Sequence, residues 1–417
     1  MIDVIIRLCK AALGRNTLMA KRKNKLDIKK SIIWVVTVMI SMTAILVGNR
    51  AVLGDASMFL GGGDDVVKAT VTDVMDSTSS TLDLGGEAIY ENTAVGFRCM
   101  IEEGEYEGQM VDAEQTIDGM YAGSEFTKTV EKGDRVLVIY SEDLALDGGN
   151  PWQFSDYYRF DKILILLGVF MALILLIGRW KGVNTLLSLL FTFAFVFMVF
   201  VPAVMAGYNA YLWASITCVF TIVMTLILIN SISKKTWATI IGCVAGTIIA
   251  AAGTVIMTKV MELTGFVDEH SYYLTLLDTE TPIDLTAIVF AAIVIGAVGA
   301  IMDVAMDLSS SLYELSEHVP DITFGKLCKS GIAISRDIIG TMANTLVLAY
   351  IGSSLSCIMI LLTYSTSAMD LMNREVIIVE LLQAIIGSLA ILLTAPCTVV
   401  TCGMLYLKHG KKKKGEA

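Results

Sequence analysis

The chain is dominated by long apolar runs that carry no charge. Each run has about 18 residues or more, enough to cross about 30 Å of hydrocarbon as a helix. Of the 417 residues, 55% are hydrophobic and 17% are charged, against roughly 45–50% and about 25% in an ordinary soluble domain. The pattern excludes a soluble enzyme and a nucleic-acid-binding protein, and predicts an α-helical protein that crosses a membrane several times. Eight spans are predicted, at about 31–53, 162–178, 183–205, 209–230, 236–261, 284–306, 340–363 and 376–407.

Residues 55–158 form an acidic, polar stretch between the first two spans. The stretch holds 22 Asp and Glu against 5 Lys and Arg. Residues 66–75, 93–101 and 135–140 alternate apolar and polar side chains, which is typical of half-buried β-strands. We therefore predict a small all-β domain here, either a five-stranded barrel or a sandwich. The aromatic residues of 151–161 are typical of an interfacial belt where the chain re-enters the membrane.

The positions of lysine and arginine predict the orientation of the chain. They concentrate in the arm 1–30, at 179–181, at 234–235, at 326–336 and in the tail 408–417. With eight spans all of these segments share one side, which the positive-inside rule assigns to the cytoplasm. Both termini are then expected in the cytoplasm and 55–158 outside it. The arm, which contains an amphipathic stretch, and the long run 31–53 favour an uncleaved first helix over a removable signal peptide.

The most unusual segment is 296–350, where charged residues follow apolar spans without a gap. Asp303, Asp307 and Glu314 share one helical face, because residues four and seven apart align on a helix. Arg336, Asp337 and Asn344 enter the following span in the same way. The segment therefore brings ionisable groups to the ends of two neighbouring spans.

Three interpretations of these residues stay open. In the first, the aspartates and Arg336 form an ion-pair staple between two spans, since charges inside a bilayer pair with a partner or face a cavity. In the second, the carboxylates and nearby Ser and Asn oxygens bind a cation or a proton, because hard cations prefer oxygen ligands. In the third, the segment is a docking surface for a cytoplasmic partner.

Two groups of small residues predict close helix packing. Gly242 and Gly246 begin a four-residue repeat of small side chains in one span, and Gly296 and Gly299 lie in another. Such faces let helix backbones approach closely in lipid. A sliding surface within a transporter is the alternative interpretation.

The sequence lacks the motifs of several common enzyme and metal-binding classes. It contains no P-loop, no H-E-x-x-H and no Cys-x-x-Cys, the motifs typical of nucleotide hydrolases, zinc proteases and thiol or zinc-ribbon proteins. The three histidines are scattered, which disfavours a histidine-built metal centre. We therefore expect no enzymatic activity, no cofactor and no resident metal.

Two strings of the membrane region resemble a known family. GAIMDVAMDLSSSLYEL and SRDIIGTMANTLVLAYIG look like the signature of the YibE/F family of bacterial membrane proteins, and EYEGQMVDAEQT, VEKGDRVLVIY and DYYRF resemble its extracytoplasmic segment. The resemblance runs from about residue 65 to about 407. It implies a polytopic protein of the bacterial cytoplasmic membrane, often found beside a second, related membrane protein, and it implies no established activity, substrate or catalytic residue. The basic arm is longer than the family core needs.

Two functions remain as hypotheses. One is a secondary transporter or permease in which Asp303, Asp307 and Asp337 carry a proton or cation and Arg336 is their counter-ion. The other is a non-enzymatic sensor or assembly protein that acts through residues 55–158 and passes a signal to 308–335. The expected partners are the lipid bilayer and either a second related membrane protein or another copy of the chain, with no nucleic acid.

Overall fold

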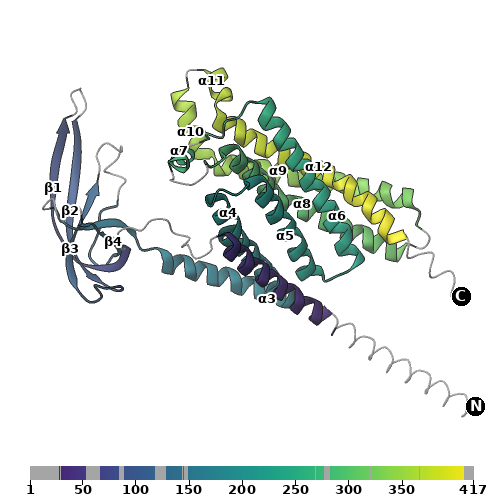
Figure 1. Cartoon of the computed structure of the whole chain (residues 1–417), viewed down its shortest axis with the longest axis horizontal. Helices are drawn as coiled ribbons and strands as arrows, with labels where there is room; N and C mark the ends of the chain where they lie inside the picture. The colour runs from purple at the N-terminus through teal and green to yellow at the C-terminus, as the bar shows by residue number, and fades with distance from the viewer. Residues whose placement is uncertain are drawn as a thin grey trace, which may run out of the picture. The chain divides into compact units, whose positions relative to one another are not determined.

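The computed structural model describes most of the chain in two compact units. One unit comprises residues 59–173, and the other comprises 1–58 together with 174–417 (Figure 1). The predicted tail 408–417 and nearly all of the predicted arm 1–30 lie outside the described residues. The structure describes residues 28, 30–52, 66–83, 89–117, 128–142, 144, 149–267, 269–276, 282–319, 322–365 and 367–407.

The first of these units contains a five-stranded barrel. Its strands are β1 (Val66–Asp83), β2 (Ile89–Ile101), β3 (Met110–Ile117), β4 (Arg135–Tyr140) and β5 (Trp152–Tyr157). They close in the order β1-β2-β3-β5-β4. Neighbours pair antiparallel except β3 and β5, which are parallel. This is the strand order of the OB-fold, a five-stranded Greek-key barrel, so the predicted small all-β domain is confirmed and takes the barrel form.

The barrel has its own apolar core. Phe97, Cys99 and Val136 are fully buried in it, as the alternation of β2 and β4 requires. Trp152 belongs to the same core and packs edge-on against Tyr106 and Tyr140. This tryptophan therefore stabilises the barrel, whereas the sequence placed it in an interfacial aromatic belt.

Seven helices among the described residues are long and apolar enough to cross a membrane. They are the N-terminal helix Lys30–Val52, the composite helix Phe160–Met205, α5 (Ala210–Asn230), α6 (Lys234–Val260), α8 (Leu285–His318), α9 (Phe324–Ser353) and α12 (Glu375–Leu407). The composite helix joins α3 (Phe160–Phe195), a π-helical turn η1 (Val196–Phe200) and α4 (Val201–Met205). Shorter helices are α7 (Glu269–Thr275), α10 (Leu355–Tyr364) and α11 (Ala368–Asn373).

One helix break agrees with the predicted spans 162–178 and 183–205, and one helix end differs from the apolar runs of the sequence. The composite helix is interrupted at Arg179, whose φ of 49° and ψ of −126° are not helical. Helix α8 continues to His318, well past the end of its apolar run, because backbone hydrogen bonding does not stop where charged side chains begin. Helix α9 then starts at Phe324, where the hydroxyl of Thr323 accepts a hydrogen bond from the amide of Lys326 and caps the helix.

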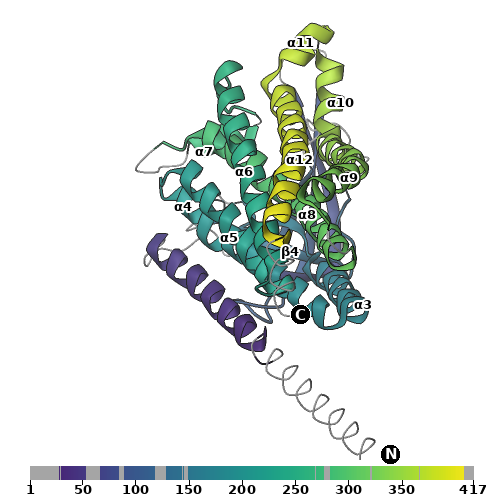
Figure 2. The ribbon, with the colours of Figure 1, turned by 90° about the vertical axis from the view of Figure 1, so that its right-hand side faces the viewer.

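The core of the helical unit lies around α12. This helix packs against α6, α8 and α9 (Figure 2). The largest buried cluster combines side chains of α5, α6, α8 and α12. A separate cluster attaches the N-terminal helix, where Ile45 packs near Phe195 and Val199 of the composite helix and Met224 of α5.

Candidate functional site

The carboxylates of α8 lie on the exposed side of that helix. Asp303 and Asp307 are both exposed, whereas the intervening Val304 and Ala305 are buried. Glu314, two turns further on, is exposed as well. The three acids predicted as a candidate site therefore share one face, as their spacing predicts.

Lys235 is a neighbour of these acids that the sequence did not single out. It is half-buried in the first turn of α6. Its ammonium lies close enough to Asp307 and Glu314 for electrostatic attraction, and close enough to Lys181 for repulsion. In the sequence, Lys235 is recognisable only as a basic residue at the end of a span. Asp307 and Glu314 therefore have the ammonium of Lys235 within electrostatic range.

The predicted residues of α9 also lie on an exposed face. Arg336, Asp337 and Asn344 are exposed, as are Thr341 and Thr345. Among the salt bridges formed by the described residues, none involves Asp303, Asp307, Arg336 or Asp337. The described residues thus show no salt bridge of the predicted staple, and all three interpretations stay predictions.

The opposite side of α8 is held by a buried polar contact. Ser309 Oγ and Thr239 Oγ1 lie 2.6 Å apart in a hydrogen bond between α8 and α6. The hydroxyl of Tyr406 in α12 donates to the carbonyl of Ser309 at 3.1 Å. This contact fixes α8 against both neighbours, and so fixes the direction in which the carboxylates point.

The predicted packing glycines have different surroundings. A Cβ at Gly242 would collide with Oγ1 of Thr398, and one at Gly246 with Oγ1 of Thr394. A Cβ at Gly296 would lie 3.0 Å from the hydroxyl of Tyr350. A Cβ at Gly299 would meet nothing within 4 Å. Close approach of backbones therefore occurs between α6 and α12 and does not involve Gly299.

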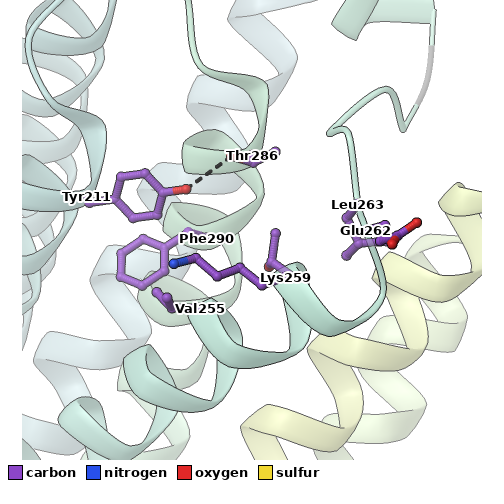
Figure 3. Close-up of a pocket in the computed structure, with 8 residues that line it drawn as sticks. Tyr211, Val255, Lys259, Glu262, Leu263, Thr286 and Phe290 are labelled. Carbon is purple, nitrogen blue, oxygen red and sulfur yellow. Dashed lines mark hydrogen bonds between the residues drawn. The ribbon is translucent and has the colours of Figure 1, made fainter.

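A cavity of about 600 Å³ lies at the other end of α8 (Figure 3). Tyr211, Lys259 and Phe290 are among its lining residues. The hydroxyl of Tyr211 is 3.0 Å from Oγ1 of Thr286, and the Lys259 side chain extends toward Phe290 while Glu262 points away. The cavity lining thus combines the aromatic rings of Tyr211 and Phe290 with the amine of Lys259 and three hydroxyls, those of Tyr211, Thr258 and Thr286.

The cavity and Asp303 are separated by about half of α8. Thr286 precedes Asp303 by 17 residues, which corresponds to about 26 Å along an α-helix. That length is close to the thickness of the hydrocarbon layer of a bilayer, about 30 Å. Two polar regions therefore lie at opposite ends of the apolar N-terminal half of α8.

No cluster of three or more His, Cys, Asp or Glu side chains that could hold a metal ion occurs in the described part of the chain. The acids of α8 form no such cluster with sulfur or imidazole ligands.

Comparison with known proteins identifies a family for the chain. A family model described as YibE/F-like protein matches residues 166–408, which is more than half of the chain and includes both polar regions of α8. Neither a curated protein nor a solved structure matches.

Proposed function

Because the chain belongs to the YibE/F-like family, we propose that it is a multi-pass protein of the bacterial cytoplasmic membrane that works as a proton- or cation-linked permease. The proposal includes no enzymatic step and no cofactor. Its support comes from the apolar helices and from the arrangement of acids on α8.

The proposed topology has eight spans with both termini in the cytoplasm and the barrel outside. The composite helix Phe160–Met205 has 46 residues, about 69 Å at 1.5 Å per residue, which is more than twice the hydrocarbon thickness. Its interruption at Arg179 favours two passes with a turn between them. Arg179 and Lys181 would then lie on the same side as Lys234 and Lys235, as the positive-inside rule favours.

The observation that carries the permease proposal is the exposure of Asp303 and Asp307 next to an apolar run. A charged side chain at the centre of a bilayer costs about 2.5–3.5 kcal/mol on insertion scales, so such acids face water, a cation or a partner. Neither aspartate has a salt bridge among the described residues. In our proposal they exchange a proton or cation, and Lys235 provides positive charge near Asp307.

The exposed polar face of α9 supports a membrane partner. Arg336, Asp337 and Asn344 lie on a helix that is otherwise apolar enough to span a bilayer, and hydrocarbon is a poor solvent for all three. We propose that another membrane helix covers this face, from a second copy of the chain or from a related membrane protein.

The test is a thermal-shift screen of the full-length protein in detergent against monovalent and divalent cations and across pH. Binding to the native state raises the apparent stability. We expect a cation-specific shift that the Asp303→Asn/Asp307→Asn variant loses. A matched control, Glu317→Gln, removes an exposed acid of α8 beyond the apolar run and should keep the shift. Absence of any shift, or a shift that persists in the double variant, would refute an ion site at these aspartates.

A sensor or assembly function is the second candidate, and the barrel favours it. OB-fold barrels commonly serve as binding modules, and this one has a self-contained core. In that case, deleting residues 65–150 abolishes function in cells while Asp303→Asn retains it. The permease proposal expects Asp303→Asn to abolish function.

A further inference from the structure

A second cleft of the helical unit has a lining unlike the others. It has a volume of about 570 Å³ and lies where the N-terminal helix, the composite helix and α5 meet. Its polar and aromatic lining residues include Lys30, Trp34, Trp180, Lys181, Asn184 and Ser231. All of them lie at the ends of apolar helices, in the residues that begin or end a predicted span.

One buried amide holds the three helices of this cleft together. Asn184 is 8% exposed. Its Oδ1 accepts a hydrogen bond from Nε1 of Trp34 at 2.9 Å, and its Nδ2 donates to the carbonyl of Leu228 at 3.0 Å. The interruption of the composite helix at Arg179 places Trp180 and Lys181 immediately before this contact. These hydrogen bonds hold the three helices that line the cleft in place relative to one another.

The charge of the lining is positive. The cleft has two lysines and no carboxylate among its lining residues, whereas three other cavities include Glu262, Glu317 and Asp134 respectively. Neither Lys30 nor Lys181 takes part in a salt bridge among the described residues. Exposed lysines without a counter-ion in a concave site attract anions.

A buried hydroxyl of the lining lacks a partner. Oγ of Ser231 is buried and makes no hydrogen bond within the described structure. Ser231 has a φ of 57° and ends α5, and its carbonyl accepts from Oγ1 of Thr236 at 2.5 Å, so its position is fixed. Because buried polar groups are nearly always hydrogen-bonded, this hydroxyl is available to donate to a bound acceptor.

The aromatic and apolar walls point to a lipid as the source of the anion. Trp180 is 72% exposed, and tryptophan beside lysine at a helix end is typical of the membrane interface. Val35 and Ile227 continue the lining on the apolar side, where an acyl chain would lie. Basic pockets between membrane helices on the cytoplasmic side are suited to anionic lipid headgroups.

We propose that this cleft binds the phosphate headgroup of an anionic phospholipid in the cytoplasmic leaflet, with Lys30 and Lys181 as counter-ions and Ser231 as hydrogen-bond donor. The side of the membrane rests on the topology in the proposed function. Bound lipid would join the N-terminal helix to the rest of the helical unit.

The test measures the thermal unfolding of the full-length protein in detergent with added phosphatidylglycerol or phosphatidylcholine. We expect phosphatidylglycerol to raise the midpoint and phosphatidylcholine not to do so. The Lys30→Gln/Lys181→Gln variant should lose this rise while keeping the wild-type midpoint in phosphatidylcholine. A matched control, Lys162→Gln/Lys259→Gln, removes the same charge elsewhere and should keep the rise.

Further arms separate the alternatives. If the double glutamine variant does not fold, Lys30→Arg/Lys181→Arg and Ser231→Ala replace it, and we expect the former to keep the effect and the latter to weaken it. A rise produced equally by inorganic phosphate would overturn the lipid assignment in favour of a free-anion site. No rise with phosphatidylglycerol, or a rise retained in the lysine variant, would overturn the site. The Asp303→Asn/Asp307→Asn variant should keep the lipid effect. The lipid site can therefore be confirmed or refuted independently of the ion site at these aspartates.

Discussion

Replacing Gly246 by alanine tests the close packing of α6 on α12. The added Cβ would collide with Oγ1 of Thr394 and lie 3.1 Å from Cγ2 of Ile301. Overpacking of this kind costs about 1–3 kcal/mol, and the better helix propensity of alanine offsets about 0.8–1.0 kcal/mol of it. The free energy of unfolding, measured by SDS titration in mixed micelles with tryptophan fluorescence, should fall by up to about 2 kcal/mol.

Gly299→Ala is the matched control for this change, because a Cβ there meets nothing within 4 Å. The propensity gain is common to both variants, so their stabilities should differ by the overpacking alone, about 1–3 kcal/mol. Adding Thr394→Ala to the Gly246→Ala variant removes the colliding Oγ1, which otherwise donates to Ala390 within its own helix. We expect this double variant to recover more than half of the loss. Equal stabilities of the two alanine variants would refute the packing described for α6 and α12.

Three further outcomes are expected. Glu102→Gln should weaken the barrel by up to about 1 kcal/mol, which amide hydrogen exchange would report as faster exchange. The hydrogen bond from Thr70 lowers the pKa of Glu102. The stabilisation by the ionised Glu102 is therefore present at neutral pH and lost as pH falls below about 4. Asn184→Ala should lower the free energy of unfolding by about 1–3 kcal/mol, because a buried indole N–H loses its acceptor; an unchanged thermal midpoint would contradict this. Burial raises the pKa of the Cys99 thiol to about 11, so maleimide at pH 8 should label it only when the barrel opens; mass spectrometry showing labelling of the native protein as fast as that of Cys357 would argue against it.

The barrel shows which strands a sequence reveals. Strands β1, β2 and β4 alternate apolar and polar residues, and their cores follow directly. The inner face of strand β3 is hard to recognise in the sequence because it includes a polar residue, Gln115. The buried side-chain amide of Gln115 donates to the carbonyl of Lys128 and accepts from the amide of Val130. Strand β5 was not predicted, because its aromatic residues are also typical of a membrane interface. Only the contacts of Trp152 with Tyr106 and Tyr140 show that it belongs to the barrel core.

The candidate site was predictable in its spacing but not in its contacts. That Asp303, Asp307 and Glu314 share a face follows from helical periodicity alone. Which cation faces them depends on how α6 packs on α8, and the structure brings Lys235 there. Arg336 lies on α9 with no salt bridge among the described residues. The sequence could not predict this, because adjacency of two spans does not fix their rotation about their own axes.

The arrangement of eight spans, on which both proposals depend, is tested most directly by cysteine accessibility in intact cells. Single cysteines replace Lys181, Tyr208 and Ile232 of the full-length protein, and a membrane-impermeant maleimide is applied before and after permeabilisation. With two passes between Phe160 and Met205, Tyr208→Cys should label in intact cells, and Lys181→Cys and Ile232→Cys only after permeabilisation. Labelling of Ile232→Cys in intact cells with protection of Tyr208→Cys would show a single pass there, and would contradict the account.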